Sequence, residues 1–130
     1  MDDRDPRCLP HALALATREW PMFPLHHAVD GVCSCGKTDC TSVGKHPRTK
    51  NGLKNATTDE NRIMSWFRKW PSANVGTVTG ASAGIVVIDI DPRHGGTESL
   101  AALEQKHGPL PQTVESQTGG GGRHLIFAHP

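Results

Sequence analysis

The feature that most constrains the fold is the run Ile85–Ile90, in which four β-branched residues lead into Asp89, Asp91 and Pro92. A short, apolar, β-branched run of this kind predicts a strand buried on both faces. Side chains at positions i and i+2 of a strand share a face, so Asp89 and Asp91 should lie together and Ile90 should point into a core. The sequence therefore predicts a sheet that ends in a pair of carboxylates.

These two carboxylates form the first candidate site. Two carboxylates on one face repel each other and are costly to desolvate, and a divalent cation between them removes both penalties. Hard oxygen ligands of this type suit Mg²⁺ or Mn²⁺. The alternative is that Asp89 and Asp91 are ordinary strand-end and turn residues, because Asp-Pro also begins turns. The residues alone leave both interpretations open.

A second candidate site combines three thiols and one imidazole in a short stretch, at Cys33, Cys35, Cys40 and His46. This donor set matches a closed tetrahedral zinc site, although the first spacing differs from that of the commonest zinc fingers. His26 or His27 could replace His46 as the fourth ligand. The alternatives are unconnected reduced cysteines or a disulfide; the disulfide is disfavoured because no secretory signal is visible and Cys8 would be left over.

A third candidate site is the glycine run 119–122, followed by Arg123 and His124. Glycines let backbone N–H groups approach a phosphate closely, and the two side chains add charge and hydrogen bonds at the same place. The alternative is a mobile hairpin loop, and the run does not fit the P-loop pattern.

Basic residues after the cysteines indicate a solvated loop or a nucleic-acid contact; they are Lys45, Arg48, Lys50 and Lys54.

Periodicity and capping signals predict the remaining elements. We expect helices over 10–20, over 57–69 with Thr57 as N-cap and Glu60 at the third position, and over 97–107 with Leu100 and Leu103 inward. Trp66 and Phe67 fall at core positions rather than at stacking positions. We expect further strands over 22–25, 74–79, 111–118 and 124–128, with 74–79 pairing with the Ile85–Ile90 strand as a hairpin.

Composition limits the class of protein. A chain of 130 residues with 35% hydrophobic residues and a mean hydropathy of −0.45 fits one loop-rich domain spanning 1–130. The net charge of +1 provides no global basic field, so a nucleic-acid contact needs a local patch. No apolar stretch reaches the ~18 residues of a membrane span, and the first residues lack a secretory signal. These features predict a cytoplasmic protein with no membrane partner.

Taken together, the order of these motifs resembles the N-terminal domain of bifunctional DNA primase/polymerases, the prim-pol branch of the archaeo-eukaryotic primase superfamily. The matching stretches run from CSCGKTDC to SANVGTVTG, then IVVIDIDPRHGG, then GGGGRHLIF, and the resemblance covers about residues 10–130. It implies that Asp89 and Asp91 are the acidic catalytic motif. It also implies that His124, with Arg123, Gly121 and Gly122, contacts the phosphates of the incoming nucleotide. Residues 33–46 resemble the zinc-binding stem of many relatives.

The resemblance implies an α/β (α+β) fold in which helices pack on a mostly antiparallel sheet like that of RNA-recognition motifs (RRM-like). It implies a template-dependent nucleotidyltransferase that uses Mg²⁺ or Mn²⁺, nucleoside triphosphates and a single-stranded DNA template. A fused or separate replicative helicase is an expected partner. The alternatives are a catalytically inactive, DNA-binding zinc module and a metal-dependent nuclease or phosphatase.

One departure from the family pattern concerns a third acidic motif on a later strand. The sequence stops at Pro130 before such a residue, so we expect a C-terminally incomplete domain. Two carboxylates should bind Mg²⁺ or Mn²⁺ weakly, because Mg²⁺ demands near-octahedral geometry. We therefore expect little or no primer synthesis from these 130 residues.

Overall fold

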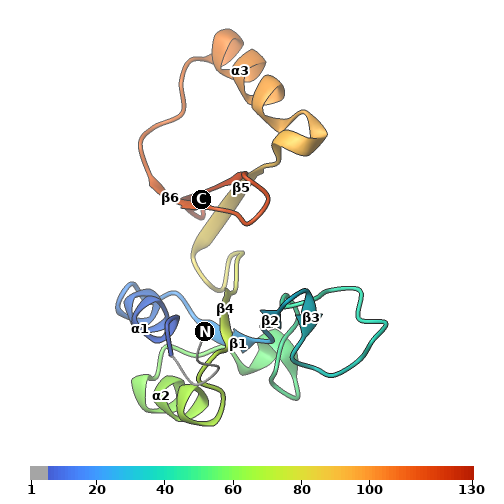
Figure 1. The fold of residues 1–130 in the computed structure, drawn as a ribbon. Coiled ribbons are helices and arrows are strands. Elements are labelled where there is room, and N and C mark those ends of the chain that lie inside the picture. The colour runs from blue at the N-terminus through green and yellow to red at the C-terminus, as the bar shows by residue number, and fades with distance from the viewer. Residues whose placement is uncertain (1–5) are drawn as a thin grey trace. The chain divides into compact units, whose positions relative to one another are not determined.

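The computed structural model describes residues 6–130, which form helices and antiparallel sheets (Figure 1). This mixture confirms the predicted α+β class, whereas the RRM-like arrangement and the single domain over 1–130 stay predictions. Contacts divide the chain into two compact units, Met1–Val78 and Thr79–Pro130, and each is described by itself. Within residues 6–130, no helix combines the length and the apolar character that crossing a bilayer requires.

The first unit begins with α1 (Leu9–Thr17), which carries Pro10 in its first turn. The helix ends three residues before the predicted end, and Pro21 does not terminate it. Glu19 adopts a left-handed φ of 62°, and its backbone N–H donates to the Ala16 carbonyl at 2.9 Å. This left-handed residue closes the last turn, because a residue in that conformation cannot continue a right-handed helix.

Helix α2 (Glu60–Lys69) lies close to its predicted bounds, but its N-cap is different. The Asp59 carboxylate accepts a hydrogen bond from the Asn61 backbone N–H at 2.9 Å, while the Thr57 hydroxyl accepts one from the Asp59 N–H at 3.1 Å. The prediction of Thr57 as N-cap is therefore wrong. Asp59 takes this place because its short carboxylate reaches the free N–H groups of the first turn and adds negative charge there.

We predict that Asp59→Ala lowers the free energy of unfolding by about 1 kcal/mol, the usual cost of losing a helix N-cap. Asp59→Asn should retain most of this stability, because asparagine caps helices about as well as aspartate. Urea denaturation of the three proteins measures the difference. Equal losses from both substitutions would show that the cap does not act through its side-chain oxygen.

The core of the first unit lies where α1 and α2 pack with strand β1 (Met22–Leu25). Its buried members are Ala12, Ala16, Met22, Ile63, Phe67 and Ala73. Trp66 packs half-buried against this cluster and Phe67 is 3% exposed, which confirms both as core residues. The apolar side chains that lie along one face of α2 therefore pack in the core rather than stack on bases.

Strand β4 (Asn74–Thr77) pairs antiparallel with β1, from Met22 opposite Thr77 to Leu25 opposite Asn74. The predicted hairpin between 74–79 and Ile85–Ile90 is therefore wrong; only Gly80 and Ile85 form a bridge there. The reason is packing at Gly76, where an added Cβ would lie 2.7 Å from the Phe23 ring. The missing side chain at Gly76 leaves room for the end of the Phe23 ring against β4.

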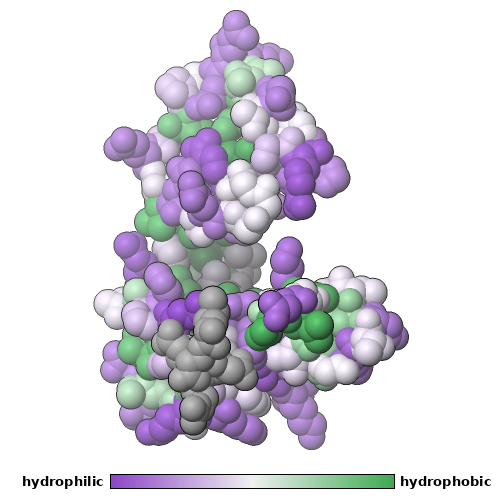
Figure 2. Space-filling model, in the orientation of Figure 1, coloured by the Kyte–Doolittle hydropathy of each residue, from purple (hydrophilic) through white to green (hydrophobic). Residues whose placement is uncertain are grey.

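Strands β2 (Ala28–Val29) and β3 (Val32–Cys33) form a short hairpin, and the 3₁₀ helix η1 (Gly52–Asn55) follows later in the same unit. Val29 and Val32 on this hairpin are 53% and 63% exposed. Figure 2 shows a hydrophobic area over the hairpin. The segment 33–46 leaves the end of β3 and returns beside it.

The second unit contains β5 (Ile85–Ile90), the 3₁₀ helix η2 (Pro92–His94), α3 (Gly96–His107), β6 (Val114–Gln117) and β7 (Arg123–Ala128). Its sheet has the order β5-β7-β6, and both neighbouring pairs are antiparallel. The predicted strands and the C-terminal helix are thus confirmed to within a few residues. Strand β7 lies in the centre although it comes last in the chain.

Helix α3 covers one face of this sheet, because Leu100 of α3 lines a pocket with Leu125 of β7. Ile90 and Leu125 are buried on this face, as predicted for Ile90. The prediction that Ile85–Ile90 is buried on both faces is wrong, since Val86 and Ile88 are 39% and 38% exposed. The twelve-residue helix covers only part of the sheet, and its Leu103 is 57% exposed rather than inward.

Candidate functional site

The first candidate site forms where β5 and β7 pair. Asp89 lies directly opposite His124, and Asp89 Oδ1 is 3.3 Å from His124 Nε2. Directly opposite side chains of an antiparallel pair share a face and lie close together. Ser116 of β6 lies opposite His124 on its other side, so Asp89, His124 and Ser116 form one row across the three strands. The acidic motif and the histidine after the glycine run, which are far apart in the sequence, therefore lie side by side on the sheet.

Asp91 follows the end of β5 with an extended backbone, which continues the alternation and directs its side chain to the side of Asp89. Its Oδ1 accepts a hydrogen bond from the Arg93 backbone N–H at 2.9 Å and lies 3.4 Å from Arg93 Nε. His94 Nε2 is 3.7 Å from Oδ2. The Arg93 backbone hydrogen bond is the main cause that lowers the pKa of Asp91, and the guanidinium adds to it.

The donor set of Asp89 and Asp91 fits a magnesium-type ion. Mg²⁺ keeps several waters and is commonly held by one or two carboxylates together with the phosphates of its substrate. Within residues 6–130, the only group of three or more metal-ligating side chains is the cysteine cluster described below. The two aspartates would therefore supply two ligands and leave the remaining positions to water and phosphate oxygens.

The glycine loop, residues 119–122, joins β6 to β7 and is closed by Thr118. The Thr118 backbone N–H donates to the Gly122 carbonyl at 3.0 Å, and the Thr118 hydroxyl accepts from the Gly122 N–H at 2.9 Å. Gly122 is buried, and a Cβ there would lie 2.5 Å from the Ile90 carbonyl oxygen. Glycine is therefore required for the loop to pass over the end of β5.

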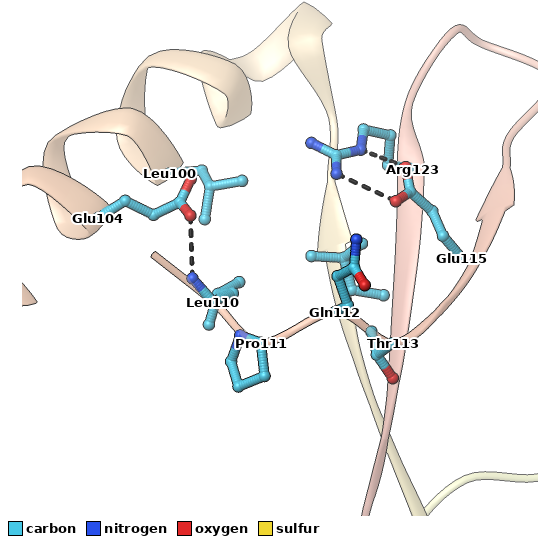
Figure 3. A pocket seen from close by; sticks show the side chains of 9 residues that line it. Leu100, Glu104, Leu110, Pro111, Gln112, Thr113, Glu115 and Arg123 are labelled. Atoms are coloured by element: carbon cyan, nitrogen blue, oxygen red, sulfur yellow. Dashed lines mark hydrogen bonds and ion pairs between the residues drawn. The ribbon is translucent and has the colours of Figure 1, made fainter. Parts of the chain in front are cut away.

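Arg123 lies on the opposite face of the sheet from His124, because adjacent residues of a strand alternate. Its guanidinium donates to both carboxylate oxygens of Glu115 on β6, at 2.5 and 3.1 Å, and these hydrogen bonds lower the pKa of Glu115 (Figure 3). The pair lines a pocket of about 340 Å³ beneath α3 that also contains Glu104, whose carboxylate accepts from the Leu110 N–H. The structure thus separates Arg123 from His124.

The second candidate site is the cysteine cluster, defined as Cys33, Cys35, Cys40 and His46. One ligand atom from each residue lies within 4.8 Å of all the others. In a tetrahedral zinc site with Zn–S bonds of about 2.3 Å, ligand atoms are about 3.8 Å apart, so a small contraction would close this cluster around an ion. The four predicted residues come together, and they could hold zinc.

Hydrogen bonds prepare this cluster for a cation. The Gly44 backbone N–H donates to Cys33 Sγ at 3.4 Å and is the largest cause that lowers the pKa of Cys33 to about 6. Cys33 Sγ also lies 3.5 Å from His46 Nε2. A low pKa favours the thiolate, which is the form that binds a metal. The His26 ring lies against the His46 ring with 4.4 Å between centroids, so the alternative ligand lies beside the cluster.

The surroundings of the cluster are fixed by Ser34 and Asn74. The Ser34 hydroxyl contacts His26 Nδ1 at 2.9 Å, the His27 N–H at 3.0 Å and Arg48 Nη2 at 2.8 Å. The Asn74 side-chain amide donates to the carbonyls of His26 and Gly44. Such secondary contacts orient metal ligands.

The basic residues of the following loop divide into two groups. Arg48 is half-buried, and its guanidinium lies over the Trp70 ring at 5.5 Å, so it connects the loop to α2. Lys45, Lys50 and Lys54 are exposed. The exposed lysines are the members of this set that a nucleic acid could reach.

Several residues of these sites were missed by sequence reasoning. Ser116 and Arg93 had no signal of their own, because their positions depend on strand register and on the fold of the glycine loop. Asn74 was assigned only to a strand. A side-chain amide at the first position of the strand is the one sign in the sequence that Asn74 contacts another segment.

Comparison with known proteins assigns the chain to a family. No curated protein and no solved structure matches it. The family model described as "Bifunctional DNA primase/polymerase, N-terminal" (Prim-Pol) matches residues 12–130, which include both candidate sites. This match confirms the resemblance and supports a primase/polymerase-type function at the level of the family. The chain belongs to the bifunctional DNA primase/polymerase N-terminal (Prim-Pol) family.

Proposed function

We propose that this chain is a template-dependent nucleotidyltransferase domain of DNA replication that acts on nucleoside triphosphates. The observation that carries the proposal is the pairing of Asp89 with His124, 3.3 Å apart on one sheet face. A carboxylate for a metal ion and an imidazole for a phosphate are thereby adjacent, and phosphoryl transfer depends on holding metal ions and phosphate-binding donors in fixed positions close together.

The proposed roles follow from the contacts. Asp89 and Asp91 would hold Mg²⁺ or Mn²⁺, which when bound activates the attacking hydroxyl and stabilises the leaving pyrophosphate. His124 would donate a hydrogen bond from Nε2 to a phosphate oxygen, at the point where it now faces Asp89. The backbone N–H groups of Gly121 and Gly122 now donate to the carbonyl and the hydroxyl of Thr118, so they would contact a phosphate only after these hydrogen bonds within the loop open. Arg123 points to the other face and is engaged by Glu115, so a phosphate contact by Arg123 would require that pair to open.

The cysteine cluster, holding zinc, would stabilise the 33–46 segment beside the exposed lysines. We propose a single-stranded DNA template as the polymeric partner and a replicative helicase, fused or separate, as a further partner. The exposed Lys45, Lys50 and Lys54 support a backbone contact, because lysines provide the sequence-independent part of nucleic-acid binding.

The proposal predicts that His124→Ala weakens binding of ATP and dATP, measured by calorimetry with Mg²⁺ present. Loss of a hydrogen bond to a charged group should cost about 1.5–3 kcal/mol. His129→Ala is a matched control, because His129 is exposed and lies beyond the end of β7. Unchanged affinity in His124→Ala, or equal losses in both variants, would contradict the assignment of His124.

A further inference from the structure

Arg93 connects the acidic turn to the glycine loop. It follows Asp91 in η2, and a Cβ added to Gly120 would lie 2.8 Å from its Nη2 and 2.9 Å from its Cζ. The guanidinium therefore lies directly against the backbone of the loop proposed to bind phosphates. Its Nε faces Asp91 Oδ1 at 3.4 Å.

The Arg93 side chain can change partners at little cost. It is 69% exposed, and its ion pair with Asp91 is long and open to solvent. Exposed ion pairs contribute little, because water and salt screen both charges. A guanidinium offers five N–H donors in a planar fork that matches phosphate oxygens, so the same side chain can turn from a carboxylate to a phosphate.

The other arginine of the sheet is less suited to this contact. Arg123 uses Nε and Nη2 on the two oxygens of Glu115 and leaves β7 on the face opposite to His124. Arg93, in contrast, contacts the loop that begins the strand of His124. Of these two guanidinium groups, Arg93 has the direct contact with the glycine loop.

We propose that Arg93 is a triphosphate-binding residue of this site. Its guanidinium contacts phosphate oxygens of the nucleotide that His124 and the glycine loop hold. When the guanidinium turns to the phosphates, Asp91 Oδ1 keeps the hydrogen bond from the Arg93 backbone N–H but loses the one from Nε, which leaves a lone pair for a divalent cation. The inference rests on the proposed function and identifies which cation of the chain faces the phosphates.

The first test compares Arg93→Gln, Arg93→Lys and His94→Ala by calorimetry with Mg²⁺, using ATP and inorganic tripolyphosphate as ligands. Arg93→Gln should weaken both about ten- to a hundredfold, the range for hydrogen bonds to a charged group. Arg93→Lys should retain part of the affinity, since it keeps the charge but loses the fork. His94→Ala removes the other basic neighbour of the Asp91 carboxylate and should weaken binding less than Arg93→Gln does.

The second test moves Arg93 without removing it. Gly120→Ala places a methyl group against the guanidinium, whereas Gly119→Ala places one in open space. The Arg93 side chain is flexible and exposed, so both variants should unfold at the same temperature as the parent chain. Gly120→Ala should weaken nucleotide binding more than Gly119→Ala does.

Four outcomes would overturn the proposal. If His124→Ala weakens binding and Arg93→Gln does not, the proposed function stands and Arg93 has no part in it. If Arg123→Gln weakens binding and Arg93→Gln does not, the contact belongs to Arg123. A loss for ATP without a loss for tripolyphosphate would show that Arg93 does not contact phosphates. If the parent chain binds neither ligand, the proposed function and the role of Arg93 both fail.

Discussion

Cys35→Ser is expected to abolish stoichiometric zinc binding and to unfold the 33–46 segment. The parent chain should contain about one zinc per molecule, because four ligands make one closed tetrahedral site. In zinc-finger peptides the bound ion contributes about 10–16 kcal/mol of apparent binding free energy. When one ligand is lost, a structural site of this kind releases its zinc ion, and the protein loses this contribution to its stability. This is the largest single effect that we expect in the molecule.

The measurement is metal analysis of purified protein, prepared without chelator, together with thermal unfolding. Cys8→Ser is the matched control, because Cys8 is the one cysteine outside the cluster and packs instead against the core of the first unit. It should retain zinc. Absence of zinc from the parent chain would refute the site, and equal zinc loss in both variants would show that the cluster is not the site.

Gly122→Ala is expected to have the second largest effect, because it combines a loss of stability with a loss of binding. The added Cβ would lie 2.5 Å from the Ile90 carbonyl and 2.9 Å from the Thr118 hydroxyl. One obstacle is backbone of β5 and the other is the side chain that closes the loop, so neither yields easily. Overpacking of this kind costs about 1–3 kcal/mol, and a shift of β7 would also separate His124 from Asp89.

Urea denaturation and calorimetry with ATP and Mg²⁺ measure the two effects. Gly119→Ala is the matched control, because the same methyl group there meets nothing within 4 Å. We expect Gly122→Ala to be less stable than Gly119→Ala and to bind nucleotide more weakly. Equal stability of the two variants would show that β7 tolerates the shift and that glycine at 122 is not required by packing.

The local helices and strands follow from the sequence, because the signals that specify them act over a few residues. The apolar stripe of α2, the β-branched run of β5 and the glycines before β7 gave bounds close to those of the structure. The cysteine cluster was also predictable: its four residues are close in sequence, so a short loop brings them together whatever the rest of the chain does. The contribution of Asn74 to the cluster was not predictable, because Asn74 lies on a strand that is far from the cluster in the sequence.

Capping details were less predictable than the helices themselves. Thr57 and Glu60 matched a capping box, yet Asp59 is the cap, since two acceptors compete within three residues. The end of α1 was set by the left-handed Glu19 rather than by the following proline. A helix N-cap contributes only about 1 kcal/mol, so local patterns do not resolve which of several neighbouring acceptors takes that position.

Strand pairing depended on tertiary structure. The short connection between residues 77 and 85 favoured a hairpin, but β4 joins β1 and β5 joins β7. Packing of Phe23 on Gly76 stabilises one pairing, and Gly122 passing over Ile90 permits the other. Each contact joins residues that are far apart in sequence, so periodicity within a window carries no information about it.

The sequence by itself determined the chemical content of this protein: two carboxylates at the end of a strand, a histidine after a glycine run, and three cysteines with a histidine in one loop. Only the tertiary structure decided which of these groups meet. Strand register aligns His124 with Asp89 and Ser116, alternation turns Arg123 towards Glu115, and the fold of the loop places Gly120 against Arg93. The physical reason is that the chemistry of a side chain is a property of one residue. The distance between two side chains, and whether they lie on the same face of a sheet, depends instead on backbone hydrogen bonds between segments that are far apart in the sequence.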